Sequence, residues 1–238
     1  MTGDGVNDAP ALSRANIGIS MGIAGTDVAK DASDMVLQDD NFANIVNAVE
    51  EGRKIYANIR NFVRYQVSTN VAAVALLLLA SVVLQLPLPL TATQILVINI
   101  LMDGPPAVAL GVEGKHANVM DRPPRPVDES LPNLIDLMLI FYLGAVMVAG
   151  SLIVYELALD TGEEYARTMC FSVFIVFQLF NVMNCRSNEN SVFKLGLFSN
   201  RAIYLAIAFS TILLLIAVQG AEWTLSLIHI SEPTRHCL

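Results

Sequence analysis

A run of glycine, aspartate and asparagine near the start of the chain could bind a metal ion and a phosphate. Residues 2–10 read Thr-Gly-Asp-Gly-Val-Asn-Asp-Ala-Pro. The glycines allow a tight backbone turn, and Asp4 and Asp8 place two carboxylates four residues apart on one loop. Magnesium commonly binds through one or two carboxylates plus a phosphate. The alternative is an ordinary surface turn, for which these residue types are also typical.

A second candidate site is a single carboxylate within a long apolar stretch. Asp103 is the only acidic residue between Glu51 and Glu113. A charged side chain near the centre of a bilayer is costly unless it is paired or bound to an ion. Asp103 therefore indicates a functional site.

Three features near Asp103 point to cation binding. Asn99 precedes it by one helical turn, which places both side chains on one face of a helix. Pro105 and Pro106 must interrupt that helix and free backbone carbonyls, which can bind cations at membrane depth. Asn70 lies in the preceding apolar stretch, where a hydrogen bond between helices explains it as well as ion binding does. We expect Asp103 and Asn99, at the broken helix, to bind a cation.

The composition predicts an integral membrane protein. Of the 238 residues, 54% are hydrophobic and only 15% are charged, which is unusual for a soluble domain. Five apolar stretches approach the roughly 20 residues that cross a bilayer, although Gln178 and Asn181 interrupt the fourth. They cover residues 62–86, 93–112, 134–157, 169–183 and 202–219. The net charge of −8 gives no basis for binding nucleic acid.

The first 41 residues are more polar and predict a small α/β unit. Short apolar runs at 17–21 and 35–37 are typical of strands, and residues 11–15 and 26–32 fit short helices. Alternating strands and helices predict a parallel sheet, whose ligands bind at the carboxyl ends of the strands. The loop of Asp4 would lie at this edge.

One long helix is expected to follow. Asp39, Asp40 and Asn41 can cap a helix that runs over 42–86, because apolar residues there keep helical spacing and no proline interrupts them. The alternative is two helices that are broken near Gly52.

Basic residues predict the orientation in the membrane. The loops on one side carry only Arg167, whereas most of the remaining basic residues outside the first unit fall on the other side. These are Arg60, Arg64, Lys115, Arg122, Arg125, Arg186, Lys194 and Arg201. The positive-inside rule then places the loop of Asp4 in the cytoplasm.

Several of these motifs resemble one family. Residues 2–10 resemble the hinge motif of P-type ATPases, whose phosphorylation domain has the haloacid-dehalogenase fold. Residues 97–107, with Asn99 and Asp103, are similar to the sixth membrane helix of calcium pumps, and residues 39–42, 50–53 and 121–125 resemble neighbouring segments of the same pumps. The resemblance implies an α/β end of the phosphorylation domain over 1–41, a stalk helix over 42–61, and an all-α membrane domain over 62–219. The last would hold helices five to nine, with a truncated end at 220–224.

The resemblance also implies roles for individual residues. The catalytic residues would be Asp4, Asn7 and Asp8, with Asp4 and Asp8 binding Mg²⁺; Thr2, Gly3, Asp4, Gly5 and Asn7 would surround the phosphate; and Asn70, Asn99 and Asp103 would bind the transported Ca²⁺. ATP would bind mostly to domains that this chain lacks, so the fragment alone would be inactive. The complete protein is expected to be a monomeric, multi-pass pump that exports Ca²⁺ through an aspartyl-phosphate intermediate. The plasma membrane of a bacterium is its expected location.

Three departures from the two-ion calcium pump predict a single transported ion. Ala73, Met102 and Gln178 stand where that pump has glutamate, threonine and glutamate, and each replacement removes an oxygen ligand or a charge. Plasma-membrane and secretory-pathway calcium pumps, which carry one ion, have similar replacements. A Mn²⁺ or mixed Ca²⁺/Mn²⁺ pump is the first alternative. A membrane-anchored phosphatase of the dehalogenase fold is the second, but an anchor has no use for the carboxylate of Asp103.

Two further features, the end of the chain and a pair of cysteines, are expected to carry no function. Residues 225–238 resemble the translation of a sequencing adaptor, so His229, His236 and Cys237 receive no weight as metal ligands. Cys170 and Cys185 lie near opposite ends of one predicted span, too far apart for a disulfide.

Overall fold

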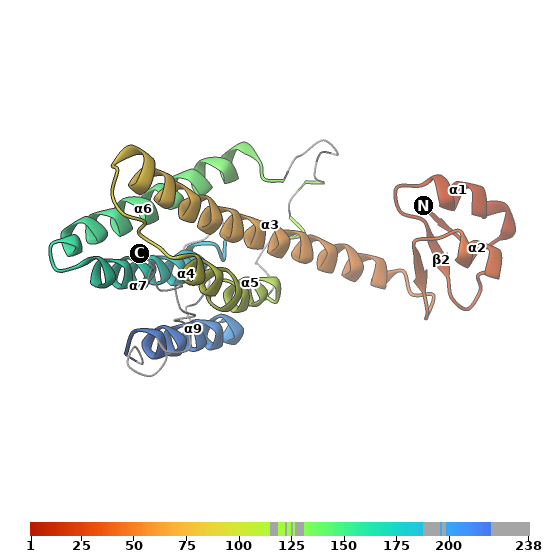
Figure 1. Ribbon diagram of the computed structural model, residues 1–238. Coiled ribbons are helices and arrows are strands. Elements are labelled where there is room, and N and C mark those ends of the chain that lie inside the picture. Colours follow the sequence, from red (N-terminus) through yellow and green to blue (C-terminus); the bar gives the residue numbers. More distant parts are fainter. Residues whose placement is uncertain are drawn as a thin grey trace, which may run out of the picture. The chain divides into compact units, whose positions relative to one another are not determined.

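The chain forms two compact units, which are described separately. A computed structural model describes residues 1–114, 119–121, 123–124, 126, 131–187, 196 and 199–219. The first unit holds Met1–Lys54 and a short segment around Val119, and the second holds most of the chain from Ile55 onward (Figure 1).

The first unit is a small parallel sheet with two short helices. Its strands β1 (Thr2–Gly3), β2 (Ile19–Met21) and β3 (Met35–Leu37) lie side by side in that order. Thr2 pairs with Ile19, and Ile19 pairs with Met35. The helices are α1 (Ala9–Arg14) and α2 (Asp27–Asp31). The predicted parallel α/β arrangement is confirmed, although β1 was not expected from the sequence.

The core of this unit is small but well buried. Leu12 of α1 and Ala29 of α2 are fully buried, and Ile19, Met21 and Leu37 form an apolar cluster in the sheet. The backbone N–H of Ala29 donates to the hydroxyl of Thr26, so Thr26 caps α2 as its residue type predicts.

A single helix follows the sheet. Helix α3 runs over Ala43–Leu78 and continues into a π-helical turn at Leu79–Val83. Gly52 lies inside it without a break, so the single-helix prediction holds, with an end slightly earlier than residue 86. From Asn58 onward one face of α3 is buried in the second unit.

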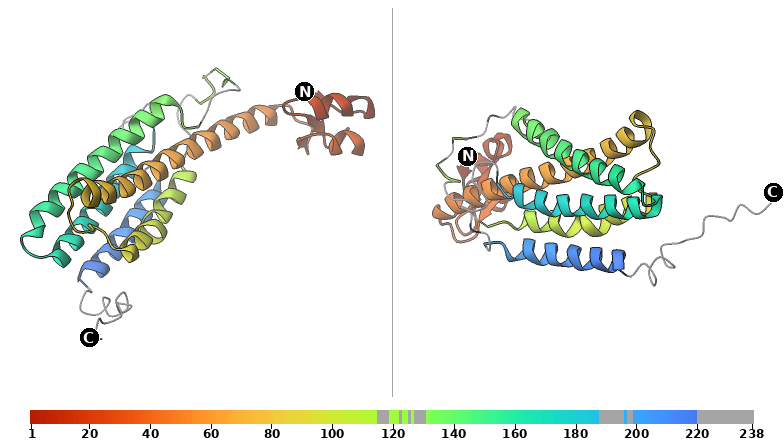
Figure 2. Two further views of the ribbon diagram at one scale, coloured as in Figure 1. Left: turned by 45° about the horizontal axis from the view of Figure 1, so that its top comes forward. Right: turned by 90° about the vertical axis from the view of Figure 1, so that its left-hand side faces the viewer.

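Five helices of the described residues are long and apolar enough to cross a membrane, as predicted. They cover Ala43–Val83, Ala92–Gly111, Leu134–Leu159, Glu163–Asn184 and Arg201–Val218. The second comprises α4 (Ala92–Val97), a π-helical turn (Ile98–Met102) and α5 (Gly104–Gly111), and the others contain α3, α6 (Leu134–Leu159), α7 (Glu163–Asn184) and α9 (Arg201–Gln219). In the second unit these helices lie alongside one another in both views of Figure 2.

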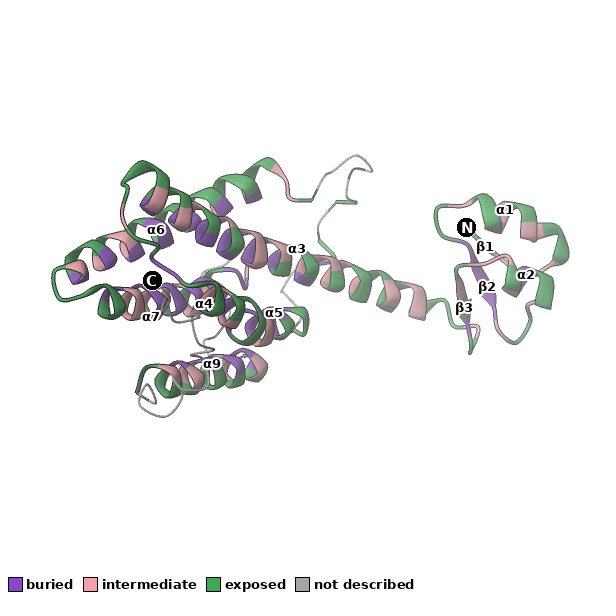
Figure 3. Ribbon diagram, in the orientation of Figure 1, coloured by how far each residue is buried: buried purple, intermediate pink, exposed green. Residues whose placement is uncertain are grey.

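The helices bury several polar residues beside an apolar core and expose many apolar residues outside. Gln178 and Asn181, which interrupt the fourth apolar stretch, are 1% and 2% exposed. The buried residues face the interior of the bundle, while many large apolar side chains of α6 are exposed (Figure 3). The apolar outer surface suits a lipid environment, because apolar side chains that face lipid carry no hydration cost. Cys170 and Cys185 are buried free thiols.

Several basic residues that predicted the orientation are engaged in packing. Arg60 Nε donates to Asp136 Oδ2 at 2.7 Å, and Arg64 Nη2 donates to the carbonyl of Asn184 at 3.2 Å. Arg186 is fully buried. Four other residues of that set lie outside the described residues, namely Lys115, Arg122, Arg125 and Lys194. The orientation itself stays a prediction.

Candidate functional site

The glycine–aspartate loop lies at the carboxyl end of β1, where the sequence placed it. A 3₁₀ turn over Val6–Asp8 joins the loop to α1. A Cβ on Gly3 would lie 2.5 Å from the Cβ of Asp8, so no larger residue fits there without a shift. Gly5 has more room, because its Cβ would meet only atoms at 3.6 Å or beyond. Close approach therefore explains Gly3 but not Gly5.

The two carboxylates of this loop point in different directions. Asp8 Oδ2 accepts hydrogen bonds from the backbone N–H groups of Asp4 at 3.1 Å and Gly5 at 3.0 Å. The Asp4 carboxylate is exposed and accepts no hydrogen bond from the described residues, and the side chain of Asn7 is exposed as well. Asp8 thus shapes the loop, and Asp4 is the carboxylate that is open to a ligand.

A neighbouring loop supports the first one. The backbone N–H of Thr26 donates to the carbonyl of Asp4 at 2.8 Å. The Asp40 carboxylate accepts from the N–H groups of Gly22, Ile23 and Ala24 at 2.7, 3.0 and 2.8 Å. These bonds favour the ionised form, chiefly those from Ile23 and Ala24, and they lower the pKa of Asp40 below its usual 3.8. Asp40 therefore fixes the loop that in turn holds Asp4.

The donor set of the first unit fits a magnesium ion only together with a phosphate. Among the described residues, no group of three or more histidine, cysteine or acidic side chains is arranged to hold a metal. One open carboxylate at Asp4, with a second carboxylate supporting the loop, matches the way Mg²⁺ binds when substrate phosphates supply the remaining oxygens. The predicted roles of Thr2, Gly3, Gly5 and Asn7 at the phosphate stay predictions.

The second candidate site is built around a break in the second membrane helix. The N–H of Asp103 donates to the carbonyl of Ile98 at 2.8 Å, which closes the π-helical turn, and α5 begins at the next residue. Pro105 and Pro106 stand in the first turn of α5, where a missing N–H costs little. The predicted break at Asp103 is confirmed.

Two hydroxyl groups from α3 contact the carboxylate of Asp103, which is 1% exposed. The hydroxyl of Tyr65 lies 3.0 Å from Oδ1, and that of Thr69 lies 3.2 Å from Oδ2. Tyr65 and Thr69 are one helical turn apart on the buried face of α3. Neither residue was predicted from the sequence, because a hydroxyl in an apolar helix is usually hydrogen-bonded to its own backbone. Their four-residue spacing opposite an isolated carboxylate was the available signal.

Asn70 and Asn99 do not join this buried cluster. Both side chains lie on the exposed surface, and no hydrogen bond within the described residues connects either of them to Asp103. Asn70 is rotated by about 100° from Thr69 around the helix, which turns it from the buried face. Within this chain Asp103 is buried and Asn99 is exposed, and the predicted roles of Asn70 and Asn99 at the transported ion stay predictions.

The interior around this break is poor in charge. The carbonyl of Met102, which Pro106 cannot bond, accepts from the hydroxyl of Ser210 at 3.4 Å. Ala73, Met102 and Gln178 are all buried, and the amide of Gln178 has no hydrogen-bond partner among the described residues. Within that part of the chain, no basic side chain pairs with Asp103. A buried carboxylate in such surroundings can bind a cation.

Comparisons with known proteins agree on one family. Residues 87–231 match the family described as "Cation transporting ATPase, C-terminus". The chain is 50% identical over 214 residues to "Calcium-transporting ATPase 1" of Schizosaccharomyces pombe, covering 89% of this chain and 24% of that protein. It is 47% identical over 209 residues to human "Calcium-transporting ATPase type 2C member 1", covering 87% of this chain and 23% of that protein. "Calcium-transporting ATPase 1" of Saccharomyces cerevisiae is 48% identical over 214 residues, covering 88% of this chain and 22% of that protein.

These matches also bear on two expectations. The chain spans about a quarter of the length of these relatives. They come from fungi and mammals, so a bacterial plasma membrane receives no support from them. The segment 225–238 lies outside the described residues, and the family match includes its first part, up to residue 231.

Proposed function

This chain belongs to the cation-transporting ATPases, and we propose that it forms the C-terminal membrane part of an ATP-driven Ca²⁺ pump in which Asp103 binds the transported ion. The observation that carries the proposal is the buried carboxylate of Asp103 at the break between the π-helical turn and α5, which pairs with no basic side chain among the described residues. Ionised groups at membrane depth are normally paired or face an ion pathway.

The contacts of Asp103 suit a site that binds and releases a cation. Tyr65 and Thr69 hold the carboxylate through hydroxyls, which carry no charge that a cation would have to displace. The hydroxyl of Thr69 also lies 3.0 Å from the carbonyl of Gln66. It can turn its single proton toward that carbonyl and offer an oxygen lone pair to the ion. Calcium, which takes six to eight oxygen ligands, accepts such a hydroxyl alongside a carboxylate.

The loop of Asp4 gives the other half of the proposed function. We assign residues 1–41 to the end of a phosphorylation domain of the haloacid-dehalogenase fold, on the cytoplasmic side. Asp4 would hold Mg²⁺, which when bound neutralises charge on a phosphoryl group. Asp8 keeps the loop in shape through its two backbone hydrogen bonds, and the exposed amide of Asn7 is free to donate to a phosphoryl oxygen.

The proposed ion is Ca²⁺, with a Mn²⁺ or mixed pump as the alternative. Both are hard cations that prefer oxygen ligands, and a carboxylate and a hydroxyl serve either. The names of the relatives favour calcium. A membrane-anchored phosphatase fits less well, because a simple anchor does not need a buried carboxylate at a helix break.

Replacing Asp103 by asparagine in the complete protein tests the proposal. Asp103→Asn keeps the shape and removes the charge, so Ca²⁺-dependent phosphorylation by ATP should be lost while phosphorylation from inorganic phosphate without Ca²⁺ remains. Asp160→Asn, at an exposed position after α6, is the matched control and should behave as the unmodified protein. Normal Ca²⁺-dependent phosphorylation of Asp103→Asn would refute the assignment of the ion site.

A further inference from the structure

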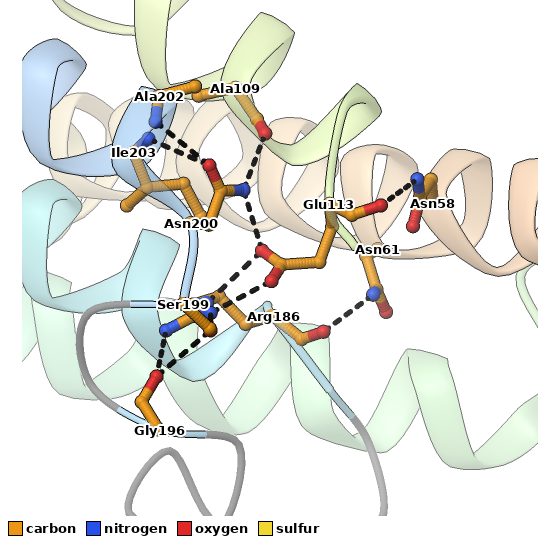
Figure 4. A network of polar contacts seen from close by, with 10 residues as sticks. All are labelled: Asn58, Asn61, Ala109, Glu113, Arg186, Gly196, Ser199, Asn200, Ala202 and Ile203. Carbon is orange, nitrogen blue, oxygen red and sulfur yellow. Dashed lines mark hydrogen bonds and ion pairs between the residues drawn. The ribbon is translucent and has the colours of Figure 1, made fainter. Parts of the chain in front are cut away.

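A polar network surrounds the end of α5 that is farthest from Asp103 (Figure 4). At its centre, Glu113 and Arg186 are 4% and 0% exposed, and Asn200 is 6% exposed. Glu113 follows α5, Arg186 follows α7 and Asn200 precedes α9, so three chain segments meet at one ion pair. None of these residues contacts Asp103, and neither ion binding nor the chemistry proposed above uses them.

The ion pair has the geometry of a strong, specific contact. Arg186 Nη2 donates to Glu113 Oε1 at 2.8 Å, and Arg186 Nε donates to Glu113 Oε2 at 3.1 Å. Asn200 Nδ2 donates to the same Oε2 at 2.8 Å. Two parallel bonds between a guanidinium and a carboxylate fix their relative orientation as well as their distance.

The network holds the last carbonyls of α5. A helix end leaves carbonyls without partners in the helix. Asn200 Nδ2 donates to the carbonyl of Ala109 at 3.1 Å, and Asn58 Nδ2 donates to those of Gly111 and Glu113, each at 3.1 Å. Glu113 binds Asn200 through its side chain and Asn58 through its carbonyl. The end of α5 is thereby fixed to α3 and to the segment before α9.

The same arginine also contacts the helix that carries the hydroxyls facing Asp103. Asn61 Nδ2 of α3 donates to the carbonyl of Arg186 at 2.8 Å. Tyr65 and Thr69 follow Asn61 by one and two helical turns on the buried face. The network therefore holds α3 and α5, the two helices whose relative position sets the contacts of Asp103.

We infer that Glu113 and Arg186 are positioning residues that set the affinity of the Asp103 site without contacting the ion. Helix α5 has eight residues and spans about 12 Å, and Asp103 and Glu113 flank its two ends, so the pair acts on Asp103 through one short helix. Without the pair, α5 keeps its apolar packing through Ala107, Ala109 and Leu110 and the amide hydrogen bonds to its carbonyls, but it loses the ion pair to the segment after α7. Asp103, which directly precedes α5, can then shift relative to Tyr65 and Thr69. This inference rests on the proposed function.

Variants that separate positioning from folding are available. Glu113→Gln alone removes the carboxylate that faces the buried charge of Arg186, and breaking a buried ion pair from one side is by itself strongly destabilising. The double variant Glu113→Gln/Arg186→Gln removes both charges and so avoids that cost. Glu163→Gln is the matched control, because Glu163 also pairs with an arginine of α7, Arg167, but at an exposed position.

The test measures Ca²⁺-dependent phosphorylation by ATP in the complete protein, together with phosphorylation from inorganic phosphate without Ca²⁺. The single and double variants should each need about tenfold more Ca²⁺ for half-maximal phosphorylation, a typical size for coupling between distant groups. The double variant should keep phosphorylation from inorganic phosphate. Glu163→Gln should match the unmodified protein in both assays.

Three other outcomes would contradict this inference. An unchanged Ca²⁺ dependence in the double variant would overturn it and leave the proposed function intact. Loss of phosphorylation from inorganic phosphate in the double variant would assign the pair to folding instead of positioning. Absence of any Ca²⁺ dependence in the unmodified protein would overturn the proposed function, and this inference with it.

Discussion

The hydroxyl of Thr69 offers the sharpest test of how the ion site is built. Thr69→Val keeps the shape and volume of the buried side chain and removes only the hydroxyl that lies 3.2 Å from Asp103 Oδ2. A hydrogen bond to a charged group contributes about 1.5–3 kcal/mol. Since about 1.4 kcal/mol corresponds to a tenfold change in affinity, the Ca²⁺ concentration for half-maximal phosphorylation should rise roughly 10- to 150-fold.

The measurement is the Ca²⁺ dependence of phosphorylation by ATP in the complete protein. Thr69→Ser, which keeps the hydroxyl and loses a methyl group, is the control and should stay close to the unmodified protein. A Ca²⁺ dependence in Thr69→Val within twofold of the unmodified value would show that the hydroxyl neither holds Asp103 nor binds the ion. Tighter Ca²⁺ binding would mean that the hydroxyl competes with the ion, and would also refute the reasoning.

Three further predictions concern the loops of the first unit and the number of ions. Asp4→Ala should prevent phosphorylation by ATP because Mg²⁺ loses its open carboxylate, and Asp8→Ala should do so less completely; normal levels in both would exclude this metal site. The backbone hydrogen bonds that lower the pKa of Asp40 stabilise the folded protein at pH values above the usual pKa of 3.8. This contribution is lost as the pH falls through the lowered pKa. Asp40→Asn should therefore unfold at a lower temperature than the unmodified protein at neutral pH, and the two unfolding temperatures should converge in acid. Equilibrium binding of radioactive Ca²⁺ should give one bound ion per phosphorylation site. Two bound ions per site would contradict a site whose charge comes from Asp103.

Much of the fold followed from local patterns in the sequence. Apolar runs gave the five membrane helices, because a bilayer of fixed thickness demands a nearly constant length of apolar chain. Pro105 and Pro106 predicted the helix break, because proline cannot donate a backbone hydrogen bond. Asp103 stood out because an isolated carboxylate in an apolar stretch has few structural explanations.

The remaining features depend on contacts between residues distant in sequence. Glu113 and Arg186 are 73 positions apart, and neither residue type nor spacing connects them before the helices pack. Asn70 and Asn99 are exposed within this chain, so their predicted contact with the ion depends on residues outside it and stays a prediction. The rotation of α3 in the bundle brings Tyr65 and Thr69 to Asp103.

The charge balance around Asp103 explains why a single divalent ion is expected. Within the described residues its partners are two neutral hydroxyls and the first turn of α5, whose dipole contributes about 0.3–1 kcal/mol to a nearby anion. With one divalent ion bound, the net charge of the ion and Asp103 is +1, and with two ions bound it would be +3.

Repulsion between two ions at this site would be severe. Two unit charges 4 Å apart repel by about 4 kcal/mol at an effective dielectric constant of 20, and two divalent ions repel four times as strongly. Ala73, Met102 and Gln178 are buried in the same bundle and supply no negative charge to offset this repulsion. A further carboxylate from outside this chain would balance the first ion, and a second ion would remain uncompensated.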